Sequence, residues 1–356
     1  MNNNIPTYEI LDTLQEQIST INIYRKQGNL ISLGNQLTTL LESLDELIAR
    51  SLVVFLTLDL KNEQEEDNGD YQNEDYKVTP TDMIRANKLV GNILLRIVSG
   101  ELIIEDGHDD ERMDQAAKII AHLSGRAIGS HIRTWMIPYI DPNGNIEQFQ
   151  IKLHEPGYTG NGIGFKTWGA APLLSKKLIQ ENLISDIKNR PVLELGTGTG
   201  MIGIICEKLG APEITLTDYH PKVLENAKIN VELNECQDCY ITPLDFIEFA
   251  KQSLSNNNND DHNEWKDKKY SVVIASDLLY EMDHAEHLPI AVEKLMENDF
   301  YFLIPLRDTH WKEVNRFEEK MKEIGLYQRI KQDTILQEDE GVVKYRYYEY
   351  SRLASP

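Results

Sequence analysis

The residues with the clearest chemical potential lie in the run ELGTGTG at positions 194–200. Three glycines at alternate positions permit a tight turn and leave the backbone amide groups open to a ligand. The helix predicted directly after them, over 201–209, would add the positive partial charge of its N-terminal end. A buried strand that leads through such a turn into a helix is typical of sites that hold a nucleoside.

Glu194, two residues before the first glycine, narrows the class of nucleoside. A carboxylate at the mouth of the strand repels a pyrophosphate but attracts an ammonium group, such as the one in the amino-acid end of S-adenosylmethionine. The competing interpretation of Glu194 is an exposed strand-end acid without a partner. The frame GTGMIG at 198–203 also fits the dinucleotide fingerprint G-x-G-x-x-G, so an NAD-dependent dehydrogenase stays open as an alternative.

Asp218 closes the next predicted strand, 214–217, at a suitable distance after the glycines to bind a ribose. A carboxylate at this edge would accept hydrogen bonds from both ribose hydroxyls in either class of enzyme, so Asp218 indicates a nucleoside and leaves the chemistry open. Its alternative role is to cap the helix predicted to begin near Pro221.

The elements that must position these residues alternate regularly after residue 191. This alternation predicts an α/β fold with a doubly wound, seven-stranded Rossmann-like sheet, whose last two strands form an antiparallel terminal hairpin. Seven strands, rather than the six of a dehydrogenase, favour a methyltransferase. The predicted strands are 192–195, 214–217, 240–244, 271–275, 300–304, 326–335 and 342–352, and the predicted helices are 201–209, 221–233, 284–296 and 311–324.

Residues 1–130 are predicted to form a helical region that precedes the catalytic domain, 131–356. Apolar residues at helical spacing between 10 and 48 predict two helices joined near 28–34. An acidic segment near 61–78 is predicted to be a disordered insert. Further helices are predicted at 83–97 and 113–128, and a β-hairpin at 132–140 and 146–153.

Composition excludes several classes of protein. The 356 residues, 41% of them hydrophobic, suffice for a large core, and no apolar run approaches the roughly 20 residues that span a membrane. Three cysteines exclude a disulfide scaffold, and a net charge of −22 argues against a broad nucleic-acid surface. We therefore expect a cytoplasmic protein that acts on a protein or a small molecule and binds neither nucleic acid nor membrane. Its oligomeric state stays open, with a monomer favoured.

Five parts of the sequence stand out together: WGAA at 168–171, ELGTGTG at 194–200, Asp218, LDF at 244–246 and SDLLY at 276–280. Together they resemble the seven-strand protein-lysine methyltransferases and, more narrowly, the fungal members that modify translation elongation factors. The resemblance covers about residues 145–352, and a fungal branch acting on elongation factor 2 carries an N-terminal extension. It implies an S-adenosylmethionine-dependent protein-lysine N-methyltransferase whose substrate is an elongation factor, with elongation factor 2 favoured. A small-molecule or nucleic-acid methyltransferase on the same fold is the alternative.

The resemblance also implies a set of cofactor-binding residues, and no metal ligand is expected in this sequence. Phe246 stands where the family more often has tryptophan and is expected to contact the adenine. For Trp168 a core anchor, and for Asp245 a helix cap, are the alternatives left open. The expected cofactor-binding residues are Trp168, Glu194, Gly196, Thr197, Gly198, Gly200, Asp218, Asp245, Phe246 and Ser276.

Two residues after the fourth strand are the predicted catalytic pair. Methyl transfer needs a neutral lysine amine, which at pH 7 is only about one part in a few thousand of a free lysine with pKa near 10.4. Asp277 is assigned to positioning and charge balance, because a buried carboxylate would raise the pKa of the lysine. Tyr280 is expected to supply a ring wall and a hydroxyl contact, with either water or Tyr280 carrying the proton. A helix N-cap for Asp277 and a packed aromatic for Tyr280 are the alternatives.

Three other patterns are interpreted as structural. The motif C-x-x-C at 236–239 lacks the second pair of ligands that a zinc site needs. Glu281, His284 and His287 are interpreted as the polar surface of a helix. The alternating aromatic and basic residues at 344–350 are interpreted as the packing of a closing strand.

Overall fold

The computed structural model divides the chain into two compact units, residues 1–136 with 157–159 and residues 137–156 with 160–356. Most of the predicted acidic insert near 61–78 and the asparagine run at 256–259 lie outside the described residues. No helix within the described part of the chain is long and apolar enough to cross a membrane. The structure describes residues 6–55, 78–123, 130–156, 166–254, 265, 267–307, 309–338 and 341–352.

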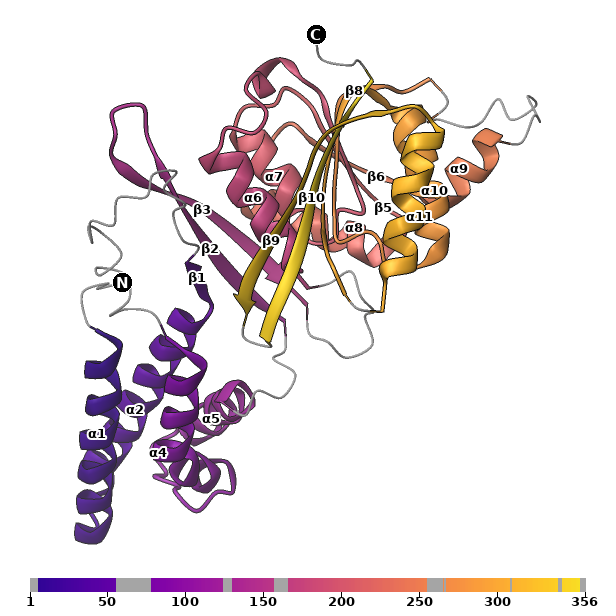
Figure 1. Ribbon diagram of the computed structural model, residues 1–356. Coiled ribbons are helices and arrows are strands. Elements are labelled where there is room, and N and C mark those ends of the chain that lie inside the picture. The colour runs from indigo at the N-terminus through magenta and orange to yellow at the C-terminus, as the bar shows by residue number, and fades with distance from the viewer. Residues whose placement is uncertain are drawn as a thin grey trace. The chain divides into compact units, whose positions relative to one another are not determined.

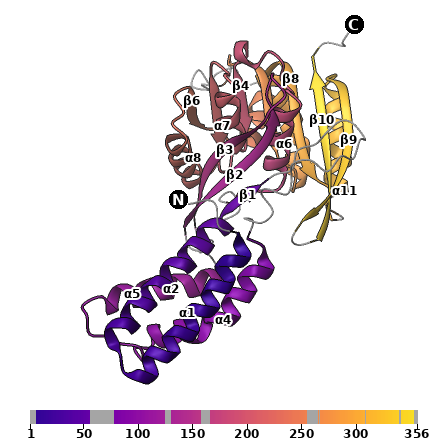
Figure 2. The same ribbon diagram turned by 90° about the vertical axis from the view of Figure 1, so that its left-hand side faces the viewer.

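The first unit is helical, as the spacing of its apolar residues predicts. In Figure 2 its helices lie side by side, with α1 and α5 each packed against both α2 and α4. Leucine side chains from α1 and α2, among them Leu14, Leu37 and Leu44, are fully buried in the core. The elements described in this unit are α1 (Thr7–Gln27), α2 (Leu30–Ser51), β1 (Val53–Phe55), α4 (Pro80–Val98) and α5 (Asp109–Leu123).

The second unit contains the predicted doubly wound sheet. Within the described residues the strand order is β6-β5-β4-β7-β8-β10-β9. The first five strands are parallel, and β10 and β9 close the sheet in antiparallel pairing. The fold prediction is therefore confirmed, including the terminal hairpin. The strands are β4 (Val192–Leu195), β5 (Ile214–Asp218), β6 (Cys239–Pro243), β7 (Tyr270–Ser276), β8 (Met296–Pro305), β9 (Tyr327–Glu338) and β10 (Gly341–Ser351).

Helices cover both faces of this sheet (Figure 1): α6, α7 and α8 lie on one face, and α9, α10 and α11 on the other. The second set of helices and the sheet enclose an apolar core that includes Phe249, Leu288 and Phe317. Two of the helices, α6 and α9, are absent from the elements predicted above. The helices are α6 (Ala170–Gln180), α7 (Met201–Lys208), α8 (Pro221–Leu233), α9 (Phe246–Leu254), α10 (Met282–Leu295) and α11 (Trp311–Glu323).

A β-hairpin, β2 (His131–Ile140) and β3 (Ile146–Glu155), stands where it is predicted. Asp141 stabilises its turn by accepting hydrogen bonds from the backbone amides of Asn143 and Asn145. Strand β1 pairs in parallel with the first half of β2.

The outer edge of β3 is bound by asparagine side chains of α8, which we call the asparagine ladder: Asn226, Asn230 and Asn234. Asn234 exchanges two hydrogen bonds with the backbone of Lys152, at 2.6 and 3.1 Å. Asn230 does the same with the backbone of His154, at 2.6 and 3.2 Å. Asn226 adds a second donor to the carbonyl of His154. The ladder thereby gives β3 the pairing that a neighbouring strand would otherwise supply.

Candidate active site

The glycine run forms a loop at the point where the sheet reverses its winding. Strand β4 lies between β5 and β7, so the chain winds to one side after β4 and continues on the other side with β7. Ligands of such sheets bind at this point, at the carboxyl ends of the strands. The loop after β4 and the residues after β7 therefore meet at one edge.

All three alternating glycines have positive φ angles, 64° at Gly196, 54° at Gly198 and 81° at Gly200. Side chains rarely tolerate this conformation. A Cβ atom on Gly196 would also lie 2.4 Å from a methyl carbon of Leu278, in the segment after β7. The loop is further fixed by the amide of Thr197, which donates to the carbonyl of Thr217 at 2.8 Å.

Glu194 lies inside the protein rather than at an open strand mouth, since only 2% of its surface is exposed. Its Oε2 accepts hydrogen bonds from the hydroxyl of Thr197, at 2.8 Å, and from the amide of Gly203, at 3.0 Å. The exposed-acid interpretation is therefore wrong: Glu194 fixes the glycine loop to the first turn of α7. Burial raises its pKa to about 8. Both hydrogen bonds reach Oε2, which leaves Oε1 for a ligand.

Asp218 ends β5 beside the glycine loop. Its carboxylate accepts hydrogen bonds from the amides of Gly198, at 3.5 Å, and His220, at 3.0 Å. The second contact fixes the loop before α8, whose N-cap residue is His220 itself. Burial raises the pKa of Asp218. The carboxylate is thus held at the same edge as the glycines, the position at which a ribose would be recognised.

The segment around Trp168 is attached to the glycine loop. The hydroxyls of Thr167 and Thr199 form a hydrogen bond of 3.0 Å, and the amide of Thr167 donates to Glu155 at the end of β3. The amide of the ladder residue Asn230 also donates to the carbonyl of Thr199, at 2.8 Å. Trp168 is 38% exposed, so it is not a core anchor. Its contact with the cofactor stays a prediction.

The residues after β6 have a clear structural role. Asp245 Oδ1 accepts hydrogen bonds from the amides of Ile247, at 3.0 Å, and Glu248, at 3.1 Å, and so caps α9. This is the capping role left open for Asp245, and an adenine contact stays a prediction. Phe246 is buried, and its ring lies 5.5 Å from that of His284.

Asp277 follows Ser276, the last residue of β7, and has a left-handed backbone with φ of 49°. Its amide donates to the carbonyl of Leu303 in β8 at 2.9 Å. Its two carboxylate oxygens accept hydrogen bonds of 3.2 and 3.3 Å from the guanidinium of Arg307. Asp277 is not a helix N-cap, because Glu281 holds that position in α10.

Tyr280 packs edge-on against His284, with 4.3 Å between the ring centroids. Burial, together with the charges of nearby acidic groups, raises the pKa of Tyr280 to about 12. With this pKa the phenol keeps its proton near pH 7.

His284 is 7% exposed, so its interpretation as a surface residue is wrong. Its ring fills the space between Tyr280 and Phe246, and burial lowers its pKa. Nδ1 has no hydrogen-bond partner among the described residues.

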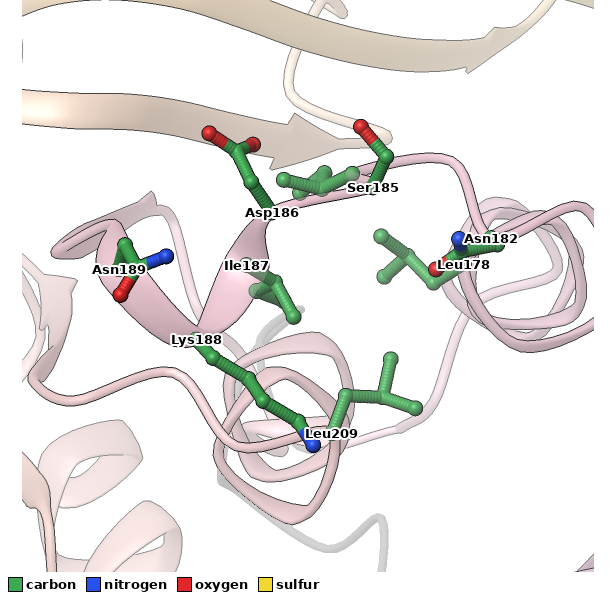
Figure 3. A pocket seen from close by; sticks show the side chains of 9 residues that line it. Leu178, Asn182, Ser185, Asp186, Ile187, Lys188, Asn189 and Leu209 are labelled. Atoms are coloured by element: carbon green, nitrogen blue, oxygen red, sulfur yellow. The ribbon is translucent and has the colours of Figure 1, made fainter.

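The remaining candidates stay apart from this edge. Cys236 and Cys239 are free thiols, and no group of metal-ligating side chains occurs in the described residues. A hollow of about 290 Å³ is lined by Leu178, Ile187 and Leu209, among others, whose side chains are drawn in Figure 3. It lies at the segment leading into β4, at the amino end of the strand, and so differs from the glycine-loop site.

The geometry fits a nucleoside with a cationic amino-acid end. The three glycines leave the loop backbone open at alternate positions, Asp218 holds a carboxylate where a ribose would bind, and Oε1 of Glu194, which accepts neither of the two hydrogen bonds above, could receive an ammonium group. Trp168 is tied to this loop through its neighbour Thr167.

Comparisons with known proteins identify the family. A family model described as lysine methyltransferase matches residues 146–324, half of the chain. Protein-lysine N-methyltransferase rrg1 of Schizosaccharomyces pombe is 31% identical over 269 residues, which cover 71% of this chain and 81% of rrg1. Protein-lysine N-methyltransferase EFM2 of Saccharomyces cerevisiae is 30% identical over 230 residues, 57% of this chain and about half (51%) of EFM2.

Among solved structures, magnesium protoporphyrin IX methyltransferase from Synechocystis PCC 6803 is 13% identical, and the match covers 51% of this chain and 78% of that one. The TM-score of this match is 0.38. The chain belongs to the lysine methyltransferase family, and it is a protein-lysine N-methyltransferase that uses S-adenosylmethionine.

Proposed function

We propose that this enzyme methylates a lysine of a translation elongation factor in the cytoplasm, with elongation factor 2 as the favoured substrate. The segments at 168–171 and 276–280 support this choice, because they resemble those of the fungal enzymes that modify elongation factors. A net charge of −22 supports a protein acceptor over a nucleic acid.

The observation that carries the proposal is the position of Asp277 and Tyr280 beside the glycine loop. Strands β4 and β7 are neighbours, and Leu278 packs directly against Gly196. An amine that approaches Asp277 therefore reaches the edge where the loop would hold the cofactor. We assign the adenosine and amino-acid ends of the cofactor to Asp218, Glu194 and the glycine loop, with Trp168, Thr197, Asp245, Phe246 and Ser276 as further contacts.

Bound S-adenosylmethionine supplies a methyl group on a sulfonium; the N–C bond forms as the C–S bond breaks, and the electron pair stays on sulfur. The protein must present the acceptor nitrogen in line and without its proton. We assign Asp277 to orient the amine. We assign the ring of Tyr280 to line the site and its hydroxyl to donate a hydrogen bond to the amine nitrogen. Because Tyr280 keeps its own proton at neutral pH, water takes the proton from the lysine.

The test is transfer of label from methyl-tritiated S-adenosylmethionine to purified elongation factor 2, with elongation factor 1A and total RNA as parallel acceptors. We expect label on one lysine of elongation factor 2, located by mass spectrometry. Asp277→Ala should abolish transfer and keep the Kd for S-adenosylhomocysteine within a few fold. The exposed Asp283→Ala is the matched control and should retain activity. Label in RNA, or in neither protein, would refute the proposed substrate.

A further inference from the structure

The ion pair between Asp277 and Arg307 has no counterpart in the predicted site. Arg307 lies two residues after the end of β8, at the same sheet edge as Asp277 after β7. The guanidinium forms one hydrogen bond to each carboxylate oxygen, the two-point geometry that fixes both position and orientation of a carboxylate. Arg307 therefore acts directly on the group assigned to receive the substrate amine.

The backbone of Asp277 is fixed from the same element. Its amide binds the carbonyl of Leu303, four residues before Arg307, and its φ of 49° is one that residues other than glycine seldom adopt. Backbone conformations of this kind concentrate at functional sites. Main chain and side chain of Asp277 are thus both held by β8 and the residues that follow it.

The contribution of this ion pair to the stability of the fold is expected to be small. The Asp277 side chain is 11% exposed, but that of Arg307 is 39% exposed, and ion pairs with such an exposed partner add little to stability. What the guanidinium does change is the local charge. The groups that act most strongly on the pKa of Tyr280 include Asp218, Tyr219, Asp277 and Glu281, and none of these four is cationic.

An unpaired Asp277 in this acidic surrounding would favour the ammonium form of an incoming lysine, which cannot attack. A nearby opposite charge typically shifts a pKa by about 1–3 units. A carboxylate already paired with a guanidinium still offers hydrogen-bond acceptors but carries little net charge. The pair thus resolves the conflict between holding a lysine amine and keeping it neutral.

We propose that Arg307 is a positioning residue of the transfer site, which orients the Asp277 carboxylate and balances its charge so that the substrate amine is received without a proton. The proposal rests on the proposed lysine transfer at Asp277. It does not depend on which protein carries the lysine.

The first test needs no acceptor protein. The Kd values of S-adenosylmethionine, which has a sulfonium charge, and of S-adenosylhomocysteine, which lacks it, are measured by calorimetry for the wild type and for Arg307→Gln. Loss of the guanidinium should strengthen the binding of S-adenosylmethionine relative to that of S-adenosylhomocysteine, so that the ratio of the two Kd values changes at least about five-fold. Arg307→Lys should keep the wild-type ratio. Arg316→Gln is the matched control, because Arg316 forms the same two-point contact with Glu286 on α10.

The second test is the pH profile of kcat on the labelled acceptor protein. Arg307→Gln should move the rising limb up by about one pH unit, which lowers kcat about ten-fold at neutral pH, with KM little changed. Arg307→Lys should leave the pH of the rising limb unchanged, because lysine keeps the positive charge. It should lower kcat several-fold, because lysine cannot form the two-point contact that the guanidinium makes with a carboxylate.

The outcomes separate the two proposals. A wild type that labels no protein contradicts the proposed function, whereas the ratio of Kd values still decides the role of Arg307. An unchanged ratio and an unmoved limb in Arg307→Gln would overturn that role. If Arg307→Gln fails to fold, Arg307→Lys decides: a several-fold lower kcat with unchanged cofactor affinity supports the role, and wild-type kcat overturns it.

Discussion

Replacing Glu194 by glutamine separates the charge of this side chain from its hydrogen bonds. The amide oxygen of glutamine can accept from Thr197 and Gly203 as Oε2 does, so the glycine loop keeps its support. What is lost is the carboxylate that would pair with the ammonium group of the cofactor. The substitution therefore tests the electrostatic reason for expecting S-adenosylmethionine at this loop.

The magnitude follows from the pKa of Glu194, about 8. At pH 7 such a group is ionised in about one molecule in ten, so charging it costs about 1.4 kcal/mol. A cationic ligand that binds only the ionised form should bind about fifty-fold more tightly at pH 8 than at pH 6. Glu194→Gln should give a nearly flat profile and, at pH 8, an affinity at least about ten-fold below that of the wild type.

The assay is calorimetry with S-adenosylhomocysteine from pH 6 to pH 8, where the wild type should release a proton on binding. Methylthioadenosine, which lacks the amino-acid end, serves as the control ligand, and its affinity should not increase between pH 6 and pH 8. Equal Kd values of the wild type at pH 6 and pH 8 would refute the reasoning. So would an increase in affinity with pH that persists in Glu194→Gln.

The same pKa has a consequence for stability. The unfolded chain releases the proton of Glu194 above about pH 4.5, whereas the folded protein without ligand retains it to about pH 8. This group therefore lowers the free energy of unfolding as pH rises through that window. Glu194→Gln removes that contribution, so its melting temperature should fall less between pH 5 and pH 8 than that of the wild type.

Three further predictions concern the supports of the site. Gly203→Ala would place a Cβ atom 2.0 Å from a methyl carbon of Leu216, so the free energy of unfolding, measured in urea, should fall by about 1–3 kcal/mol. A variant as stable as the wild type would contradict this prediction. Asn230→Ala leaves the carbonyl of Thr199 without this donor and should cost about 1–3 kcal/mol and weaken cofactor binding; unchanged affinity would show that the ladder does not act on the loop. Tyr280→Phe should lower kcat without moving the pH limb between 6 and 9, because the phenol has a pKa of about 12; a moved limb would make Tyr280 the base.

The alternation of strands and helices could be predicted because each buried strand is a short apolar run between polar loops. Strand β8 shows where this fails, since it begins at Met296 rather than at residue 300. The polar residues at 297–299 resemble a loop in sequence. Asp299 is nevertheless buried within the strand, because Arg190 and Arg329 pair with its carboxylate. Pairing of this kind comes from distant segments and leaves no local pattern.

The part of the site that could be predicted from the sequence consists of residues that directly follow parallel strands, because the carboxyl ends of these strands meet at one edge of the sheet. That rule selected Asp218 and Asp277, and it applies equally to Arg307, two residues past β8. Residues placed by packing gave a weaker signal: His284 lies on a helix with polar neighbours, yet its ring is enclosed by Tyr280 and Phe246. Burial on such a face depends on tertiary contacts rather than on spacing along the chain.

The asparagine ladder has a consequence beyond the site. An exposed strand edge offers unpaired amide and carbonyl groups that can recruit a strand from another molecule, which is a route to aggregation. In β3 these groups at Lys152 and His154 are already engaged by amide side chains of α8. Because side chains on a helix cannot themselves be extended by a further strand, the hairpin ends at β3 and offers no template for intermolecular sheet growth along this stretch.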